Sequence, residues 1–114
     1  MVTCFLKYCI DPEKIKEFTH YGKLWIDLVN RKGGIHHGYL IPHEGPNNVG
    51  YASFSFPSLA EYEVYRNKIP GCPDCQKALA YARKSKCIVS FERNFYTPVF
   101  EGINDKARLF YKGK

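Results

Sequence analysis

Residues 33–66, GGIHHGYLIPHEGPNNVGYASFSFPSLAEYEVYR, decide the fold expected for this chain. Residues 35–41 and 49–56 each have the composition and alternation of a β-strand. The turn between them, HEGPNN, is built from Gly, Pro and Asn, which set or tolerate turn dihedrals, so we expect the two strands to pair as a hairpin. Ser58 then caps a helix, and Glu61, three residues later, completes a capping box.

The flanking segments complete an order of strand, helix, two strands, helix and strand. Residues 2–9 alternate from face to face as a strand does. Asp11-Pro12 is typical of a helix start, and Gly33-Gly34 is typical of a helix end. The second helix is interrupted by Ile69-Pro70-Gly71, and residues 86–96 form the fourth strand.

This order predicts an α+β protein of the ferredoxin-like βαββαβ type. Two right-handed βαβ units interleave into a four-stranded antiparallel sheet with two helices on one face. A chain of 114 residues forms one core and not two. We expect the domain to occupy residues 1–97 and a tail to occupy residues 98–114, in which ARLFYKG has the pattern of a further short strand.

The two faces of the predicted sheet differ in composition. Apolar side chains dominate the face expected to meet the helices: Cys4, Leu6, Tyr8, Ala52, Phe54, Phe56, Val89 and Phe91. The opposite face mixes aromatic and polar side chains: Thr3, Phe5, Lys7, Tyr51, Ser53, Ser55, Ser90, Glu92 and Asn94. That mixture is too aromatic for a plain solvent face and too polar for a dry core, so we expect this face to meet another protein surface or a ligand.

Five segments within residues 2–99 closely resemble the NIPSNAP family of the dimeric α+β barrel superfamily. They are VTCFLKYCIDPEK, HYGKLWIDLVNRKGG, HHGYLIPHEGPNN, YASFSFPSLAEYEVYR and CIVSFERNFYTPV. The resemblance implies a C₂ homodimer in which two sheets pack face to face into a barrel. Superfamily relatives include cofactor-poor monooxygenases and haem-degrading enzymes. The family supplies no agreed set of catalytic residues to carry over, and fold alone does not fix function.

Composition narrows the class of protein. Apolar residues make up 45% of the chain, which is typical of a globular domain. No apolar run is long enough to span a membrane, and no signal or transit peptide precedes the first strand, so a cytoplasmic protein with reduced cysteines is expected. The net charge of +6 is diffuse and indicates a solvated basic face more than a nucleic-acid site.

His36-His37 is the first candidate for chemistry. Adjacent strand residues point to opposite faces, so the two imidazoles are poorly placed to chelate one metal, and no Cys or carboxylate has ligand spacing. No metal site is predicted. If His37 shares a face with Tyr39, the pair could bind and polarise a small ligand, with His37 moving a proton near neutral pH. The structural alternative is a hydrogen bond from each His at a sheet edge or dimer seam.

Four further residues are candidates for a ligand pocket. Trp25 and Tyr65 belong to aromatic sets at helical spacing, which more often pack a core than bind a cofactor. A pocket between helices and sheet would nevertheless be lined by them, with Tyr51 as a candidate from a strand. Arg93 is expected on the helix-facing side, where its charge needs a partner or binds an anion.

Cys72-Pro73-Asp74-Cys75 has CxxC spacing at a helix start. The helix dipole lowers a thiol pKa there, so a redox or metal role is one interpretation. The motif does not follow the first strand, as a thioredoxin-type site would, and no second CxxC completes a zinc set. Cys72 as a cap followed by Pro explains the pattern without chemistry.

Three functions are compatible with the sequence. The first is a dimeric barrel without a bound cofactor that binds a small apolar or aromatic molecule and could carry out cofactor-independent, monooxygenase-like chemistry. The second is a non-enzymatic structural or interaction module. The third is an RNA-recognition motif, which shares the element order; Val49 replaces its basic residue and Ser53 replaces an aromatic one, so nucleic acid is disfavoured.

Overall fold

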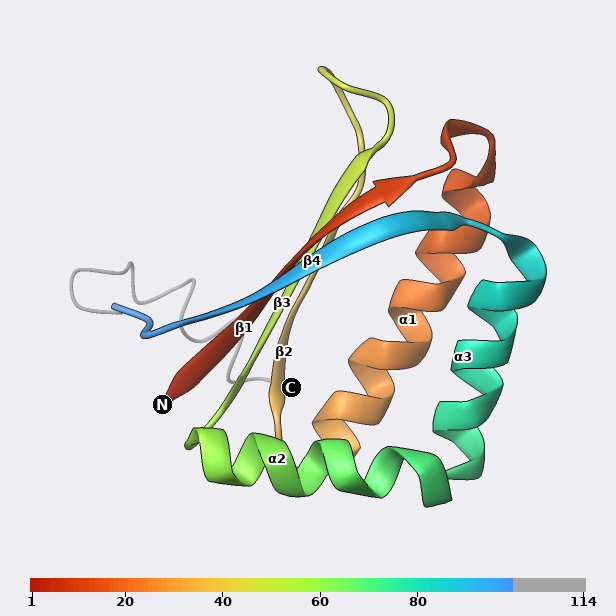
Figure 1. Ribbon diagram of the computed structural model, residues 1–114. Helices are drawn as coiled ribbons and strands as arrows, with labels where there is room; N and C mark the ends of the chain where they lie inside the picture. Colours follow the sequence, from red (N-terminus) through yellow and green to blue (C-terminus); the bar gives the residue numbers. More distant parts are fainter. Residues whose placement is uncertain (100–114) are drawn as a thin grey trace.

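The computed structural model describes residues 1–99 as a single sheet flanked by helices (Figure 1). In chain order the elements are β1 Val2–Ile10, η1 Pro12–Lys14, α1 Ile15–Arg31, β2 Ile35–Leu40, β3 Val49–Phe56, α2 Leu59–Lys68, η2 Ile69–Gly71, α3 Pro73–Ser85 and β4 Ile88–Tyr96. The further strand considered in ARLFYKG lies outside the described residues.

The four strands form one antiparallel sheet in the order β2-β3-β1-β4. β1 is central and pairs with both β3 and β4, so each strand–helix–strand unit encloses a strand of the other unit. This is the ferredoxin-like arrangement, and the predicted fold class is confirmed. Figure 1 shows the helices gathered on one side of the sheet.

The interruption predicted at Ile69-Pro70-Gly71 divides the second helical stretch into two separate helices, α2 and α3. Pro70 and Gly71 lie in the 3₁₀ turn η2 between α2 and α3. The Nε2 of Gln76 donates to the Ile69 carbonyl at 3.0 Å and ties the start of α3 to this turn. α2 therefore runs crosswise to α1 and α3, which lie side by side (Figure 1).

The predicted caps are present at three helix starts. A carboxylate oxygen of Asp11 accepts from the Glu13 N–H at 3.0 Å, and the Ser58 hydroxyl accepts from the Glu61 N–H at 3.2 Å. The Sγ of Cys72 accepts from the Cys75 N–H at 3.2 Å. Such caps satisfy backbone donors that helix geometry leaves unpaired, typically contributing about 1 kcal/mol each.

The core lies between the helix-facing side of the sheet and α1. Buried residues of α1 recur every three or four positions: Phe18, Tyr21, Gly22, Trp25, Leu28 and Val29. They pack on Cys4, Leu6, Tyr8 and Ile10 of β1 and on Ala52, Phe54 and Phe56 of β3. Val89, expected on this side, is exposed instead, because the β1–β4 register shifts beside it.

Candidate functional site

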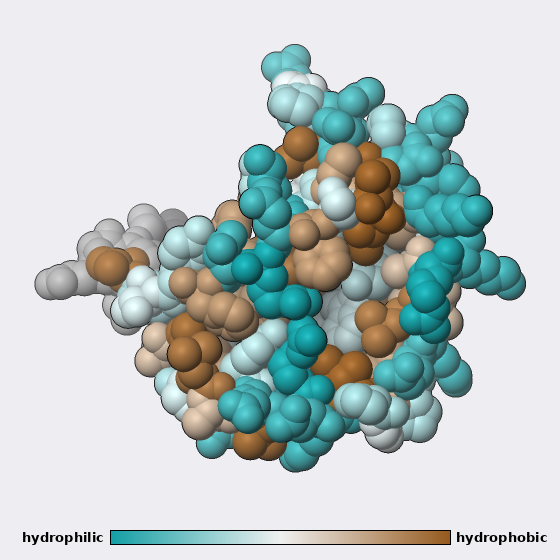
Figure 2. Space-filling model, viewed as in Figure 1, coloured by the Kyte–Doolittle hydropathy of each residue, from teal (hydrophilic) through white to brown (hydrophobic). Residues whose placement is uncertain are grey.

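A cleft of about 370 Å³ lies between the sheet and the helices. Every described strand and every α-helix contributes to its wall, which is largely aromatic and aliphatic. The lining residues are Leu6, Tyr8, Tyr21, Trp25, Val29, Tyr39, Phe54, Tyr62, Tyr65, Arg66, Ile69, Pro70, Leu79, Phe91 and Arg93. Figure 2 shows the molecule hollowed here, with pale and brown side chains inside and hydrophilic ones at the rim.

The floor of the cleft is a cluster of tyrosines. The rings of Tyr8 and Tyr39 stack at 6.0 Å, and both contact the fully buried ring of Phe18, at 5.0 and 5.6 Å. Burial raises the pKa of Tyr8 and Tyr39 well above the ordinary value and raises the pKa of Tyr21 to about 12. Their hydroxyls are therefore neutral at physiological pH and act as hydrogen-bonding groups, not as bases.

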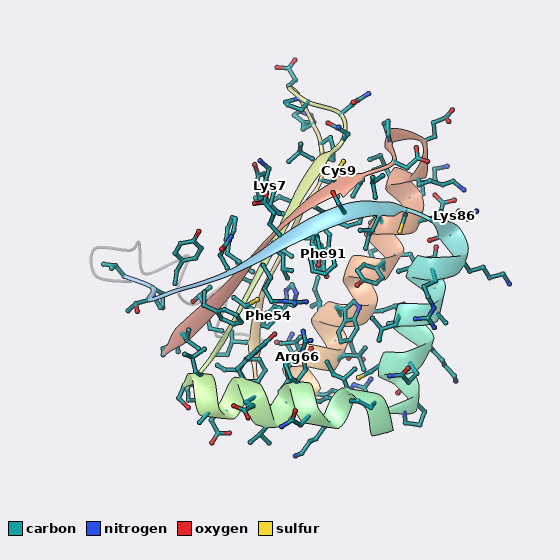
Figure 3. The ribbon with its side chains drawn as sticks, viewed as in Figure 1. Lys7, Cys9, Phe54, Arg66, Lys86 and Phe91 are labelled. Atoms are coloured by element: carbon teal, nitrogen blue, oxygen red, sulfur yellow. The ribbon has the colours of Figure 1, made fainter. Side chains whose placement is uncertain are left out.

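The cleft opens along β4. Phe91 pairs with Tyr8 and so belongs to the helix-facing side of the sheet, yet half of it (50%) remains exposed. Arg93, two residues on, has its Cζ 5.2 Å from the centre of the Phe91 ring. On the opposite wall, Arg66 of α2 donates to the Tyr62 hydroxyl at 3.3 Å. Figure 3 shows Phe54, Phe91 and Arg66 around this space.

The positive charges of Arg66 and Arg93 both affect the Cys4 thiol. Burial raises the pKa of the Cys4 thiol to about 11, and the positive charges of Arg93 and Arg66 both oppose that rise. Within residues 1–99, neither arginine forms an ion pair.

The structure does not bring His37 and Tyr39 together. The β2–β3 register shifts between His36 and Gly38, where Gly38 has φ +101°, so His37 is an extra residue in a β-bulge. The bulge places His36 and Tyr39 on the helix-facing side, with their rings stacked at 5.2 Å. His37 faces the other side and shares a 2.7 Å hydrogen bond with the Ser55 hydroxyl.

His36 is an almost fully buried histidine. Its Nδ1 accepts from the Gly38 N–H at 2.9 Å, which places the proton of the neutral ring on Nε2. That Nε2 is buried without a hydrogen-bond partner in the described part of the chain. Burial, aided by the charge of His37, lowers the pKa of His36 to about 4. The ring is therefore a neutral packing element at physiological pH.

Three of the four pocket candidates line the cleft: Trp25, Tyr65 and Arg93. Tyr51 does not. It pairs with Lys7 on the opposite side of the sheet, where its ring lies 5.6 Å from that of Phe5. Arg66 also lines the cleft and was not among the predicted site residues. Its position four residues after Tyr62 on one helix places both side chains on one face.

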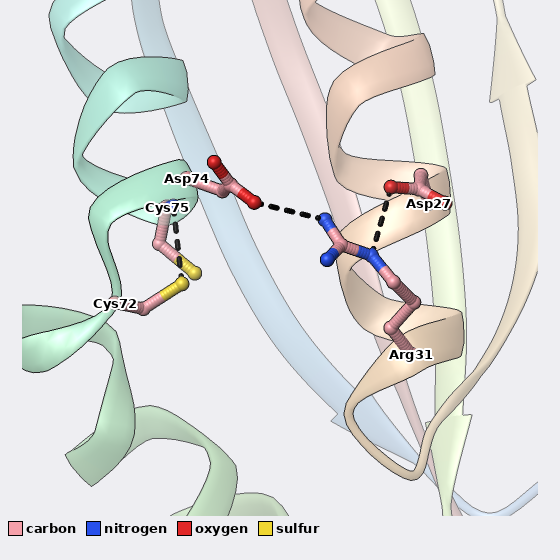
Figure 4. A network of polar contacts seen from close by, with 5 residues as sticks. All are labelled: Asp27, Arg31, Cys72, Asp74 and Cys75. Carbon is pink, nitrogen blue, oxygen red and sulfur yellow. Dashed lines mark hydrogen bonds and ion pairs between the residues drawn. The ribbon is translucent and has the colours of Figure 1, made fainter.

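Cys72 and Cys75 of the CxxC segment do not line the cleft. Figure 4 shows both at the start of α3. Burial opposes ionisation of Cys72, but hydrogen bonds from Cys75 and the charge of Lys32 outweigh it and lower the Cys72 pKa. Next to it, Arg31 bridges Asp27 at 2.9 Å and Asp74 at 3.4 Å and so links α1 to α3. These exposed ion pairs contribute little stability. The contacts of Cys72 are those of a helix N-cap.

A family comparison bears on this architecture. The NIPSNAP family model matches residues 4–100. The chain belongs to the NIPSNAP family. No curated protein matches this NIPSNAP protein at a significant level. None of its helices within residues 1–99 is long and apolar enough to cross a bilayer.

Solved structures share the fold of this NIPSNAP protein. A NIPSNAP family protein of unknown function from Agrobacterium tumefaciens has 20% identity and a TM-score of 0.75, over 91% of this chain and 94% of that one. A NIPSNAP-like domain protein from Burkholderia xenovorans has 19% identity and a TM-score of 0.72, over 90% and 89%. A putative antibiotic biosynthesis monooxygenase from Nitrosomonas europaea has 7% identity and a TM-score of 0.68, over 87% and 99%.

Proposed function

We propose that this NIPSNAP protein binds a small apolar or aromatic molecule in the cleft. The aromatic lining of the 370 Å³ cleft carries the proposal. A volume of that size is at the lower end of the range for small-molecule sites, which are concave, mostly apolar and supplied with a few polar groups. Tyrosine hydroxyls and two guanidinium groups are the polar groups here.

Binding is the function that these side chains support best. The described lining includes no carboxylate, histidine, lysine or cysteine that could act as a general base or nucleophile. The shared fold with a putative monooxygenase supplies no reacting group at this level of identity. A non-enzymatic protein that uses the cleft for ligand capture fits both observations.

A substitution that fills the cleft tests this proposal. Leu79 lies in the wall, and Leu79→Trp should place an indole in the ligand's volume; Leu59→Trp adds the same group at an exposed position of α2 outside the lining. Calorimetric titration with naphthalene-2-carboxamide, a neutral aromatic probe, should show binding to the unsubstituted protein and to Leu59→Trp. Leu79→Trp should weaken binding by about tenfold or more, or about 1.4 kcal/mol. Equal affinity in all three proteins would exclude the cleft.

We further propose that two copies pack together as a barrel through the side of the sheet that points away from the helices, here called the open face. The open face carries a ring cluster of Phe5, Tyr51 and Tyr96, with Phe5 5.6 Å from Tyr51 and 6.2 Å from Tyr96. Ile35 and Leu40 of β2 are exposed near the sheet edge on the same side. An apolar group of this kind with polar neighbours is typical of a protein interface.

The dimer is tested by placing a charge in that cluster. Sedimentation equilibrium at about 10 µM should give a dimer for the unsubstituted protein, because a C₂ interface brings each Phe5 into a desolvated patch. Phe5→Lys should give a monomer, since an unpaired ammonium group is costly to bury. Leu59→Lys, an equally drastic change on an exposed helix position, should remain dimeric. A monomeric unsubstituted protein would refute the barrel.

A further inference from the structure

We infer that the ligand of the cleft is an amphipathic anion, with an apolar body against the aromatic floor and one oxyanion between Arg66 and Arg93. This inference rests on the proposed use of the cleft as a small-molecule site, and it specifies the class of ligand. Four observations lead to it, and each concerns residues 1–99.

The first observation is the charge of the lining. Two guanidinium groups belong to the wall, and no aspartate or glutamate does. Neither arginine has an ion-pair partner within residues 1–99, where the ion pairs of the structure are made by Arg31. The cleft therefore has an uncompensated positive charge at its wall, and an anion is the complementary ligand.

The second observation is that both arginines are oriented by aromatic side chains. The guanidinium of Arg93 lies over the Phe91 ring, and that of Arg66 donates to the Tyr62 hydroxyl at 3.3 Å. A cation–π contact and a hydrogen bond restrict these long side chains before a ligand arrives. Pre-organised donors lose less conformational entropy on binding than free ones.

The third observation is that both arginines line the same cleft, although they come from elements far apart in the chain. Arg66 belongs to α2 and Arg93 to β4. Two guanidinium groups in one cleft can share an oxyanion, and guanidinium–oxyanion hydrogen bonds are among the stronger ones in proteins.

The fourth observation indicates that the rest of the ligand is apolar. Beyond the arginines, the wall continues into Phe54, Tyr65 and Trp25, all buried. A hydrophilic anion such as free phosphate would leave this aromatic surface without a partner. A molecule with one or two rings and a single acidic group would satisfy both ends of the cleft.

A matched pair of probes tests the inference. Naphthalene-2-carboxylate and naphthalene-2-carboxamide have the same rings and nearly the same shape, and they differ in charge. Calorimetry on the full chain should give about tenfold tighter binding for the carboxylate. Arg93→Gln and Arg66→Gln should each reduce carboxylate affinity towards that of the carboxamide and leave carboxamide affinity unchanged. Arg83→Gln, which removes the same charge from an exposed position of α3 outside the lining, should change neither.

The outcomes separate this inference from the proposed function. Equal affinity for the two probes, with both weakened by Leu79→Trp, would overturn the anion and retain the cleft as an apolar site. A carboxylate preference that survives Arg66→Gln and Arg93→Gln but is reduced by Arg83→Gln would assign the anion to another surface and overturn the inference. Binding of neither probe at millimolar concentration would count against the cleft itself. Arg66 and Arg93 are both exposed, so circular dichroism should show that their variants fold.

Discussion

Replacing Phe18 with alanine should lower the free energy of unfolding by about 3–5 kcal/mol. Phe18 is 0% exposed and packs against the rings of Tyr8, Tyr21 and Tyr39 at 5.0–6.4 Å. Its loss removes a large apolar group from the core and leaves a cavity under the cleft floor, between α1 and the sheet. Urea denaturation followed by the fluorescence of Trp25, the single tryptophan, measures the change.

The matched control for Phe18→Ala is Leu59→Ala. Leu59 is 58% exposed at the start of α2, and its truncation should change the unfolding free energy by no more than about 0.5 kcal/mol. Both variants need the same protein concentration, because a dimer gains stability by mass action. A loss below about 1 kcal/mol for Phe18→Ala would show that the core around α1 is not packed as described.

Acidification from pH 7 to pH 4 should destabilise the protein through His36 by about 3 kcal/mol, at about 1.4 kcal/mol for each unit of pKa change. Burial lowers its pKa from 6.5 to about 4 in the folded state. Below pH 6.5 the unfolded chain takes up a proton that the folded chain excludes. The free energy of unfolding therefore decreases as the pH is lowered, and the loss is complete only below about pH 4. Protonation of Nδ1 would also displace the Gly38 N–H that it accepts.

A variant comparison isolates this contribution. His36→Gln cannot titrate, so its unfolding free energy should fall less steeply than that of the unsubstituted protein between pH 6.5 and 4. His43→Gln, which removes an exposed histidine from the β2–β3 turn, should leave the slope unchanged. Parallel curves for the unsubstituted protein and His36→Gln would show that His36 is charged at no cost in the folded state.

Local chemistry explains why much of the fold could be predicted. Asp11, Ser58 and Cys72 cap helices because each side chain reaches a backbone N–H two or three residues away, whatever the rest of the chain does. Strand alternation likewise assigned Cys4 and Leu6 to the helix-facing side and Phe5 to the other, because period two follows from the pleat itself. Arg93 was placed correctly by the same alternation.

The errors arise where distant segments meet. A bulge depends on how two strands pair, so nothing within residues 35–41 revealed that His37 would be the extra residue and that His36 would stack on Tyr39. Gly22 shows the same limit: alanine is the better helix former, but a Cβ at Gly22 would lie 2.9 Å from the Tyr39 ring. Helix propensity cannot anticipate a ring from another element.

The amino-acid sequence by itself determined the order of elements, the helix caps, the two-sidedness of β1 and β3, and the family, because all of these depend on neighbours within a few residues or on whole-length similarity. The tertiary structure alone decided that α2 and α3 surround a cleft with α1 and the sheet, that Arg66 and Arg93 both line it, and that His37 does not. Those outcomes depend on pairing register and helix packing between segments far apart in the chain, and no local pattern carries that information.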